Sequence, residues 1–161
     1  MVYQFKLISH EAVERIISWN YDGVYSFYNM DEDLEDLKEF REDAVSNENY
    51  WSVYQRDHLI GFFSFHEHED NHIEIGLGMC PDNVGKGEGF SFLEAGLQKA
   101  VELYHPTSFG MAVAEFNKRA IKVYQRAGFQ ITHLFMQQTN GGEFQFVEMK
   151  KISFKTIIAK Y

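Results

Sequence analysis

The stretch Val84–Gly89 reads VGKGEG and separates an alternating apolar segment, Ile73–Met79, from an amphipathic segment that starts at Phe90. A glycine-rich turn between a strand and a helix exposes backbone N–H groups at the positive end of the helix dipole, where anions bind. Glycines also suit a tight turn or a close packing contact. The stretch therefore predicts a strand, a turn and a helix, with a phosphate group as candidate ligand.

Two familiar phosphate-binding motifs do not fit this turn. A Walker A loop needs Ser or Thr after its lysine, but Gly87 follows Lys86 here. A dinucleotide fingerprint, counted from Gly85, needs a third glycine where Phe90 stands. Both classes of nucleotide site are therefore excluded.

A second motif follows one helix and one strand later, in the sequence AEFNKRAIKVYQRAGF from Ala114 to Phe129. Together with Gly87 and Gly89 it resembles the GNAT N-acetyltransferase superfamily, whose loop reads Q/R-x-x-G-x-G/A and whose next helix reads N-x-x-A-x-x-x-Y-x-x-x-G-F. The helix motif is complete, with Asn117, Ala120, Tyr124, Gly128 and Phe129. Val84 departs from the pattern, because it stands where the family usually has Gln or Arg. The resemblance extends over roughly residues 50–147.

The resemblance implies an α+β fold with a mixed, mostly antiparallel sheet of about six to seven strands and flanking helices. Its central parallel strands, expected at Ile73–Met79 and Phe109–Ala114, would splay apart around the pantetheine arm of acetyl-CoA. The activity it implies is acetyl-CoA-dependent transfer of an acetyl group to a primary amine, either a protein N-terminus, a lysine or a small amine. No metal is required for this transfer.

The resemblance also implies which residues bind the coenzyme. Backbone N–H groups of the loop would hold the pyrophosphate, with the Glu88 carboxylate pointing away, and a backbone N–H between Leu77 and Met79 would stabilise the oxyanion. Asn117 would contact the coenzyme arm, although an ordinary N-cap explains an Asn at a helix start equally well. The predicted coenzyme-binding residues are Leu77, Met79, Val84, Gly85, Lys86, Gly87, Glu88, Gly89 and Asn117.

Two residues are candidates for proton transfer. Tyr124 lies two helical turns after Asn117 and shares its helix face, so it could stand beside the thioester sulfur and protonate the thiolate. Without the motif, Tyr124 would read as an interfacial core tyrosine. Glu74 is the candidate general base on the strand before the loop. Strict alternation with Ile73 and Ile75 favours a solvent-facing Glu74 equally.

Hydrophobic periodicity predicts the remaining elements. Helices are expected at His10–Trp19, Asp31–Ala44, Gly89–Tyr104 and Asn117–Ala127, with Leu34, Leu37 and Phe40 on one side of the second. Strands are expected at Val2–Ser9, Tyr50–Arg56, Leu59–His68, Ile73–Met79, Phe109–Ala114, Phe129–Gln138 and Glu143–Lys151. Turns are expected at Asp57–His58, Asp70–Asn71 and Asn140–Gly142.

Composition predicts one domain over residues 1–161, since 161 residues with 45% hydrophobic content can bury a core. No apolar run of membrane-spanning length occurs, and the N-terminus lacks the pattern of a signal peptide. The single cysteine, Cys80, excludes an internal disulfide. We therefore expect a cytoplasmic protein that does not enter membranes; a homodimer is left open.

The net charge of −9 is unevenly distributed. Residues 1–80 hold 17 acidic and 5 basic side chains, whereas residues 81–161 hold 7 acidic and 10 basic side chains. The basic half suits an anionic coenzyme, and the acidic half suits a cationic amine or a solvated surface. For the acidic run Asp31–Asp43, an exposed helix face is the favoured interpretation. Nucleic acid is a poor partner for this chain.

Other polar and aromatic clusters have ordinary explanations. His66 and His68 are close to further His, Asp and Glu residues, but their spacing matches no metal motif and suits a polar hairpin end. The aromatic segment around Tyr21 and Tyr28 suits the core, or a cation–π contact with an amine. A non-catalytic acyl-CoA sensor or interaction module is the alternative function. Retention of Tyr124 and Glu74 favours catalysis.

Overall fold

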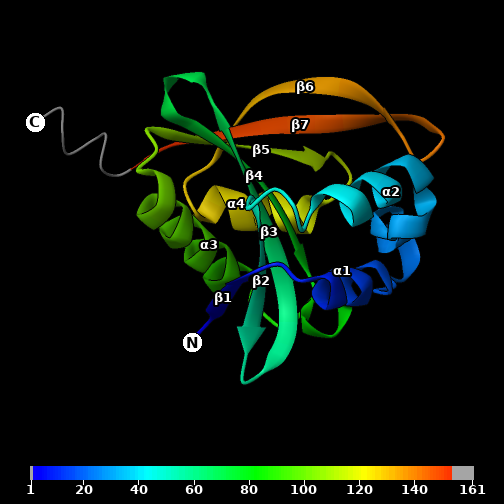
Figure 1. Cartoon of the computed structure of the whole chain (residues 1–161). Helices are drawn as coiled ribbons and strands as arrows, with labels where there is room; N and C mark the ends of the chain where they lie inside the picture. The colour runs from blue at the N-terminus through cyan, green and yellow to red at the C-terminus, as the bar shows by residue number, and fades with distance from the viewer. Residues whose placement is uncertain (1, 154–161) are drawn as a thin grey trace, which may run out of the picture. The chain divides into compact units, whose positions relative to one another are not determined.

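The structure is a computed structural model and describes residues 2–153. Its seven strands form one sheet in the order β1-β2-β3-β4-β5-β7-β6 (Figure 1). The β1–β2, β2–β3 and β5–β7 pairs are antiparallel and the β4–β5 pair is parallel, which confirms the predicted mixed sheet. The strands are β1 (Gln4–Leu7), β2 (Tyr50–Gln55), β3 (His58–His68), β4 (His72–Met79), β5 (Ser108–Ala114), β6 (Gln130–Thr139) and β7 (Gly142–Ile152).

The four predicted α-helices are present. They are α1 (His10–Ile17), α2 (Leu34–Asp43), α3 (Gly89–Tyr104) and α4 (Lys118–Arg126). Short 3₁₀ helices lie between them: η1 (Gly23–Tyr28), η2 (Met30–Glu32), η3 (Glu69–Asn71) and η4 (Pro81–Asn83). Within residues 2–153, no helix combines the length and the apolar character needed to cross a membrane.

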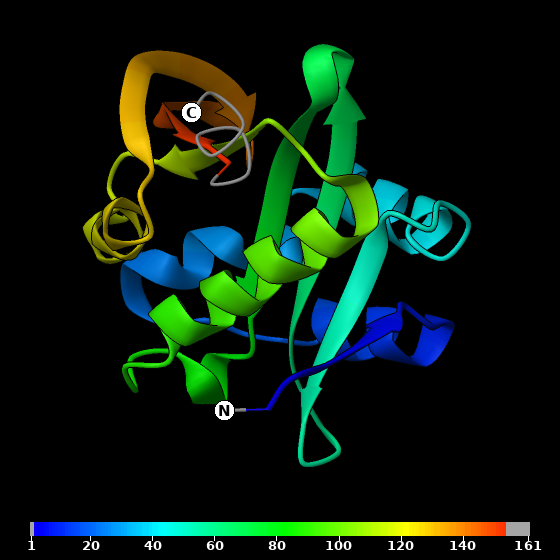
Figure 2. The ribbon, with the colours of Figure 1, turned by 90° about the vertical axis from the view of Figure 1, so that its left-hand side faces the viewer.

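The chain divides into two compact units. Unit 1 comprises residues 2–64, 77–86 and 138–143 of the described chain, and unit 2 comprises residues 65–76, 87–137 and 144–153. In unit 1 the antiparallel strands β1 to β3 lie side by side (Figure 2). Its core includes buried apolar side chains in or next to α1, α2 and β3: Ile8, Ala12, Val13, Ile16, Phe40, Ala44 and Leu59.

Unit 2 buries the apolar faces of α3 and of three strands. On α3 the buried positions are Phe92, Leu93, Gly96, Leu97 and Ala100, a spacing that forms one apolar stripe. On β4, Ile73 and Ile75 are buried while Glu74 between them is exposed, so this strand alternates as predicted. The apolar side chains Phe109, Met111, Val113, Val147 and Met149 are buried on β5 and β7.

Two details of unit 1 correct the predictions. The β2–β3 turn is Arg56–Asp57, both with positive φ, rather than Asp57–His58, because His58 pairs with Gln55 at the end of the ladder. On α2, Phe40 is buried but Leu34 is 72% exposed. The helix begins at Leu34, after residues 30–32 have formed η2, so its first turn does not place Leu34 in the core.

Asp33 connects two distant segments of unit 1. One carboxylate oxygen caps α2 by accepting a bond from the Asp36 N–H (3.1 Å), and the other accepts bonds from the Asn140 N–H (3.1 Å) and the Thr139 hydroxyl (3.2 Å). Asn140 in turn donates its side-chain amide to the Phe27 carbonyl (2.8 Å). These bonds, with the Asp36 N–H first, hold the pKa of Asp33 below its ordinary value of 3.8.

We expect Asp33→Ala to lower the urea midpoint of unfolding at pH 7. A carboxylate whose folded-state pKa is lowered contributes stability that is present above its ordinary pKa and is lost as pH falls through the folded value. The difference in urea midpoint between Asp33→Ala and the wild-type protein should therefore be constant at neutral pH and shrink below about pH 3.8. Asp31→Ala, which removes the same charge from an exposed residue, is the control. Equal midpoints for the two variants would refute the role of Asp33.

Candidate functional site

The loop between β4 and α3 has an unusual backbone. Gly85 and Gly87 adopt positive φ angles of 78° and 77° and are exposed. A Cβ atom at Gly87 would meet nothing within 4 Å, so open space adjoins this glycine. Left-handed glycines of this kind occur in loops whose backbone N–H groups bind anions. The two glycine conformations are compatible with the predicted phosphate site, which stays a prediction.

The start of α3 lies directly behind this loop. Its cap residue, Glu88, makes no side-chain capping hydrogen bond, so the positive end of the helix dipole is not neutralised in that way. A Cβ atom at Gly89 would lie 3.6 Å from a methyl group of Val123 of α4, an ordinary contact distance. The guanidinium of Arg126, also on α4, lies 4.5 Å from the centre of the Phe90 ring. The positive charge of Arg126 thus lies beside the first turn of α3. Arg126 was not among the residues predicted for the site.

The first predicted α4 residue, Asn117, is the N-cap of that helix. Its side-chain oxygen accepts a hydrogen bond from the Ala120 N–H at 3.1 Å. The capping interpretation is therefore correct, and the coenzyme contact stays a prediction. The exposed basic side chains of α4 are Lys118, Arg119, Lys122 and Arg126, with no acidic residue in the helix. This basic helix suits an anionic ligand.

The end of α4 explains the Tyr-x-x-x-Gly-Phe part of the motif. Gly128 has φ +100°, its N–H bonds to the Gln125 carbonyl (3.0 Å), and the Phe129 N–H bonds to the Tyr124 carbonyl (3.0 Å). This is the Schellman C-cap, which requires a residue in the left-handed region at Gly128. The rings of Tyr124 and Phe129 are 6.4 Å apart, the apolar contact that accompanies this cap. The cap therefore fixes Tyr124, which is half-buried, at the last turn of the helix.

The parallel β4–β5 pairing is short. It runs from His72 opposite Ser108 to Glu74 opposite Gly110. Among the described residues of unit 2, Ile75 and Gly76 carry no further ladder pair with β5, although both strands continue. The register of this pair thus ends at Glu74 and Gly110, and the splay of the two strands stays a prediction.

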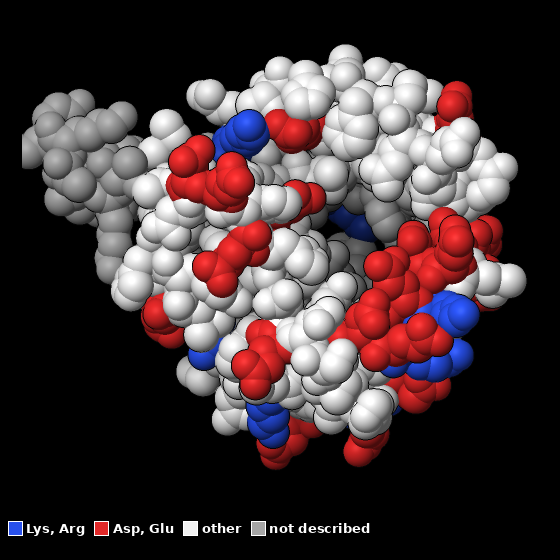
Figure 3. All heavy atoms as spheres, turned by 45° about the horizontal axis from the view of Figure 1, so that its top comes forward, with Lys and Arg blue, Asp and Glu red and all other residues white. Residues whose placement is uncertain are grey.

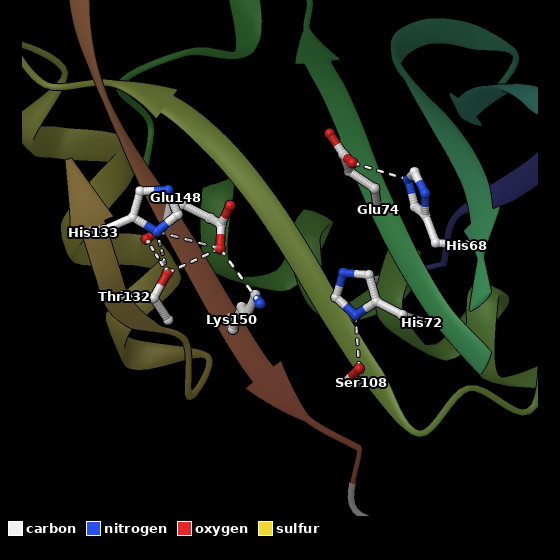
Figure 4. Close-up of polar contacts among 8 residues, drawn as sticks. All are labelled: His68, His72, Glu74, Ser108, Thr132, His133, Glu148 and Lys150. Carbon is white, nitrogen blue, oxygen red and sulfur yellow. Dashed lines mark hydrogen bonds and ion pairs between the residues drawn. The ribbon is translucent and has the colours of Figure 1, made fainter. Parts of the chain in front are cut away.

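Glu74 lies on the polar face of unit 2, where it pairs with His68 of β3 (Figure 4). The nearest oxygen and nitrogen of this pair are 3.0 Å apart, and the Glu74 side chain is 52% exposed. The structure therefore places Glu74 toward solvent, as alternation predicts. Its role as a base is a separate question, because a solvent-facing carboxylate with a histidine neighbour can still exchange protons with an acceptor.

The His72 side chain of β4 packs against the neighbouring strand β5. Its Nδ1 lies 2.6 Å from the Ser108 hydroxyl, and its Nε2 lies 2.7 Å from where a Cβ atom of Gly110 would stand. Burial, followed by the nearby charges of Lys150 and His68, lowers the pKa of His72 below 6.5. The ring is therefore neutral at pH 7, and Gly110 leaves the space that it occupies.

Glu148 of β7 belongs to a separate polar cluster of unit 2 (Figure 4). It accepts a hydrogen bond from the Thr132 hydroxyl (3.0 Å) and pairs with Lys150 (3.5 Å) and His133 (3.7 Å). In the described part of the chain, no group of three or more His, Cys, Asp or Glu side chains is placed to hold a metal ion.

The predicted site residues fall in both units. Unit 1 contains Leu77, Met79, Val84, Gly85 and Lys86, and unit 2 contains Glu74, Gly87, Glu88, Gly89, Asn117 and Tyr124. Within unit 2 the structure brings the α3 start against α4, which carries Asn117 and Tyr124. The remaining roles of these residues stay predictions.

One hydrogen bond of unit 1 at the end of β4 was not predicted from the sequence. The Tyr21 hydroxyl donates a 2.6 Å hydrogen bond to the carbonyl of Met79, the last residue of β4. The two residues are 58 positions apart, and the sequence predicted Tyr21 either in the core or in a cation–π contact with an amine. No local pattern in the sequence signals this contact.

Acidic side chains gather on the surface of unit 1 over α2 (Figure 3). The exposed acidic residues of this helix are Glu35, Asp36, Glu39, Glu42 and Asp43. Arg41 pairs with Glu14 of α1 at 3.0 Å, so part of this charge is neutralised locally. The predicted exposed acidic helix face is thus present.

Comparison with protein families gives one match over most of the chain. The model described as an acetyltransferase (GNAT) domain matches residues 2–130. No curated protein sequence matches the chain.

The solved structures with similar folds include acetyltransferases of low sequence identity. A spermidine N-acetyltransferase from Vibrio cholerae, solved with CoA and spermine, has a TM-score of 0.75 at 15% identity, covering 96% of this chain and 98% of that one. A chimera of the V. cholerae enzyme SpeG with hSSAT has a TM-score of 0.78 at 17% identity, with the same coverage. A GNAT-family acetyltransferase from Bacillus anthracis has a TM-score of 0.73 at 13% identity, covering 93% and 94%.

Proposed function

The chain belongs to the GNAT acetyltransferase family, and we propose that it transfers an acetyl group from acetyl-CoA to a primary amine that is cationic in solution. The observation that carries this proposal is the loop Val84–Gly89. Its two positive-φ glycines and open space at Gly87 lead into the dipole of α3. These features fit a pyrophosphate group, which needs several N–H donors and room for the backbone to approach.

The chain supplies the coenzyme contacts mainly from its backbone. Residues 84–89 would donate N–H groups to the pyrophosphate, supported by the basic side chains of α4. Val84 offers no polar side chain where the family usually has one, so these backbone donors must do more of the binding. Asn117 would meet the coenzyme arm at the start of α4, where its side-chain oxygen caps the helix.

Acetyl-CoA supplies the activated thioester carbonyl, and residues of this chain would stabilise the charges that develop. A backbone N–H in the segment Leu77–Met79 would donate to the oxyanion, which requires no side chain. Tyr124 would donate its phenolic proton to the departing thiolate sulfur. Its position is well defined for this task because the helix cap and the Phe129 ring restrain it.

The acceptor amine must lose a proton before it attacks. Glu74 would take this proton directly or through water and release it to solvent, to which it is open. The acidic surface of α2 would favour the approach of a cation. The similar fold of spermidine N-acetyltransferases supports polyamines as the first acceptors to test, beside protein N-termini and lysine.

A thiol-release assay with acetyl-CoA tests the proposal. Polyamines, amino-acid amides and N-terminal peptides should be acetylated faster than anionic amines of matched size. Binding of acetyl-CoA in a calorimeter without thiol release from any amine would favour the acyl-CoA sensor instead. Consistent preference for anionic acceptors would contradict the proposed acceptor class.

We expect Glu74→Gln to lower kcat/KM most at low pH. For the wild-type enzyme kcat/KM should rise with pH as more of the amine becomes neutral, and a base helps most where little neutral amine is present. Glu67→Gln is the matched control, since it removes the same charge from a neighbouring exposed residue of β3. Superimposable pH profiles of Glu74→Gln and the wild-type enzyme would remove Glu74 from the mechanism.

A further inference from the structure

The last peptide group of β4 is held at both of its polar atoms. The Met79 carbonyl accepts a hydrogen bond from the Tyr21 hydroxyl (2.6 Å), and the Cys80 N–H donates to the Ile60 carbonyl of β3 (2.7 Å). This carbonyl and this N–H belong to one planar peptide unit. Two bonds in opposite directions therefore fix the rotation of that plane.

The residue before Met79 is also restrained. A Cβ atom at Gly78 would lie 2.4 Å from Cε1 of Phe62, so the backbone at Gly78 lies directly against this ring. The Phe62 ring in turn packs at 5.7 Å from that of Phe40, which is buried. Two consecutive residues at the end of β4 are thus held, one by packing and one by hydrogen bonds.

Tyr21 is itself fixed by its own segment. Its N–H donates to the Asn29 side-chain oxygen (2.6 Å), and the Asn29 amide donates to the Asn20 side-chain oxygen (3.0 Å). These bonds close the segment that contains the aromatic helix η1. Burial, together with the nearby Cys80, raises the pKa of Tyr21 far above its ordinary value of 10.0, so the hydroxyl keeps its proton and acts as a donor.

We propose that Tyr21 is a positioning residue for acetyl transfer, whose hydroxyl fixes the Met79–Cys80 peptide and so holds the Leu77–Met79 backbone in the orientation that oxyanion stabilisation needs. The inference rests on the proposed function. A donor that is already oriented loses no free energy to reorganisation when charge develops, and small displacements of such groups cost large factors in rate. Tyr21 also connects this strand end to the segment that contains η1.

Replacing Tyr21 with phenylalanine tests the inference, because only the hydroxyl is removed. We expect kcat for acetyl transfer to fall about 10- to 100-fold, the cost of a small misplacement or a weakened oxyanion donor, while KM for acetyl-CoA changes about threefold or less. Tyr104→Phe is the matched control: its ring packs on Phe65 of unit 2 and has no place in the proposed machinery. This variant should keep the wild-type kcat.

Incorporation of 3-fluorotyrosine at position 21 distinguishes the hydrogen bond from general packing. It retains the hydroxyl, so kcat should stay within about twofold of the wild-type value. A Tyr21→Phe enzyme with unchanged kcat overturns the inference. The inference is also overturned if kcat of Tyr21→Phe falls only in proportion to the folded fraction measured by circular dichroism. The same holds if the 3-fluorotyrosine protein loses as much kcat as Tyr21→Phe. Absence of thiol release by the wild-type protein with every amine would instead refute the proposed function.

Discussion

Replacement of Gly87 with aspartate is expected to abolish acetyl-CoA binding while the chain stays folded. Gly87 has φ +77°, a region that aspartate and asparagine tolerate better than most residues, and its Cβ would meet no atom within 4 Å. The carboxylate would stand in the loop that we propose for the pyrophosphate. Repulsion between unit charges about 5 Å apart is on the order of 3 kcal/mol at an effective dielectric constant of about 20, enough to weaken binding more than about 100-fold.

Gly87→Asn is the matched control, because asparagine has nearly the same size and backbone preference without the charge. Calorimetric titration of both variants with acetyl-CoA should show weak or absent binding for aspartate and a smaller loss for asparagine. Circular dichroism should show that both are folded. Wild-type affinity in Gly87→Asp would mean that the glycines serve only the turn.

The second large effect is expected for Tyr124→Phe, which should lower kcat about 100- to 10,000-fold, the usual range for general acid catalysis. The affinity for acetyl-CoA should change little, because the hydroxyl acts chiefly in the transition state. The ring and its contact with Phe129 are kept in this variant, so the helix cap should be preserved.

The measurement is steady-state thiol release together with coenzyme affinity, after single-turnover kinetics have shown that chemistry limits the rate. Tyr54→Phe is the control, since Tyr54 lies on β2 with its ring under the Lys6 ammonium. Equal kcat values for Tyr124→Phe and the wild-type enzyme would exclude Tyr124 as the acid.

Local signals predicted the elements around the site well. The bounds of α3 agree at both ends with the prediction, because a glycine-rich turn precedes the helix and the apolar stripe runs through it. The Tyr-x-x-x-Gly-Phe motif could be recognised for the same reason. It is a helix C-cap, and the glycine, the phenylalanine and the hydrogen bonds lie within six residues of one another.

Alternation along β4 also predicted the exposure of Glu74 correctly. Its contact with His68 could not be predicted in this way, because it depends on which strands pair. The β2–β3 turn was misplaced by one residue for a related reason. A register shift between Val53 and Tyr54 sets which residues close the hairpin, and Arg56 gives no sign of a positive φ. Such shifts are decided by the packing of neighbouring strands.

Contacts between distant segments could not be predicted. The Asp33 carboxylate meets Asn140 across 107 positions, and the Tyr21 hydroxyl meets Met79 across 58. Asp33 fell inside the predicted helix Asp31–Ala44, and Tyr21 in an aromatic segment indicated burial or a cation–π contact with an amine. Each of these contacts is a hydrogen bond between single polar groups of two distant residues. Such bonds leave no periodic pattern in the sequence.

Mass spectrometry of the acceptor after reaction with acetyl-CoA that carries ¹³C in its acetyl group tests the central claim most directly. With spermidine or an N-terminal peptide, the wild-type protein should place the labelled acetyl group on an amino nitrogen, and Gly87→Asp should place none. The claim would be contradicted if the wild-type protein bound acetyl-CoA but labelled no amine of the cationic panel.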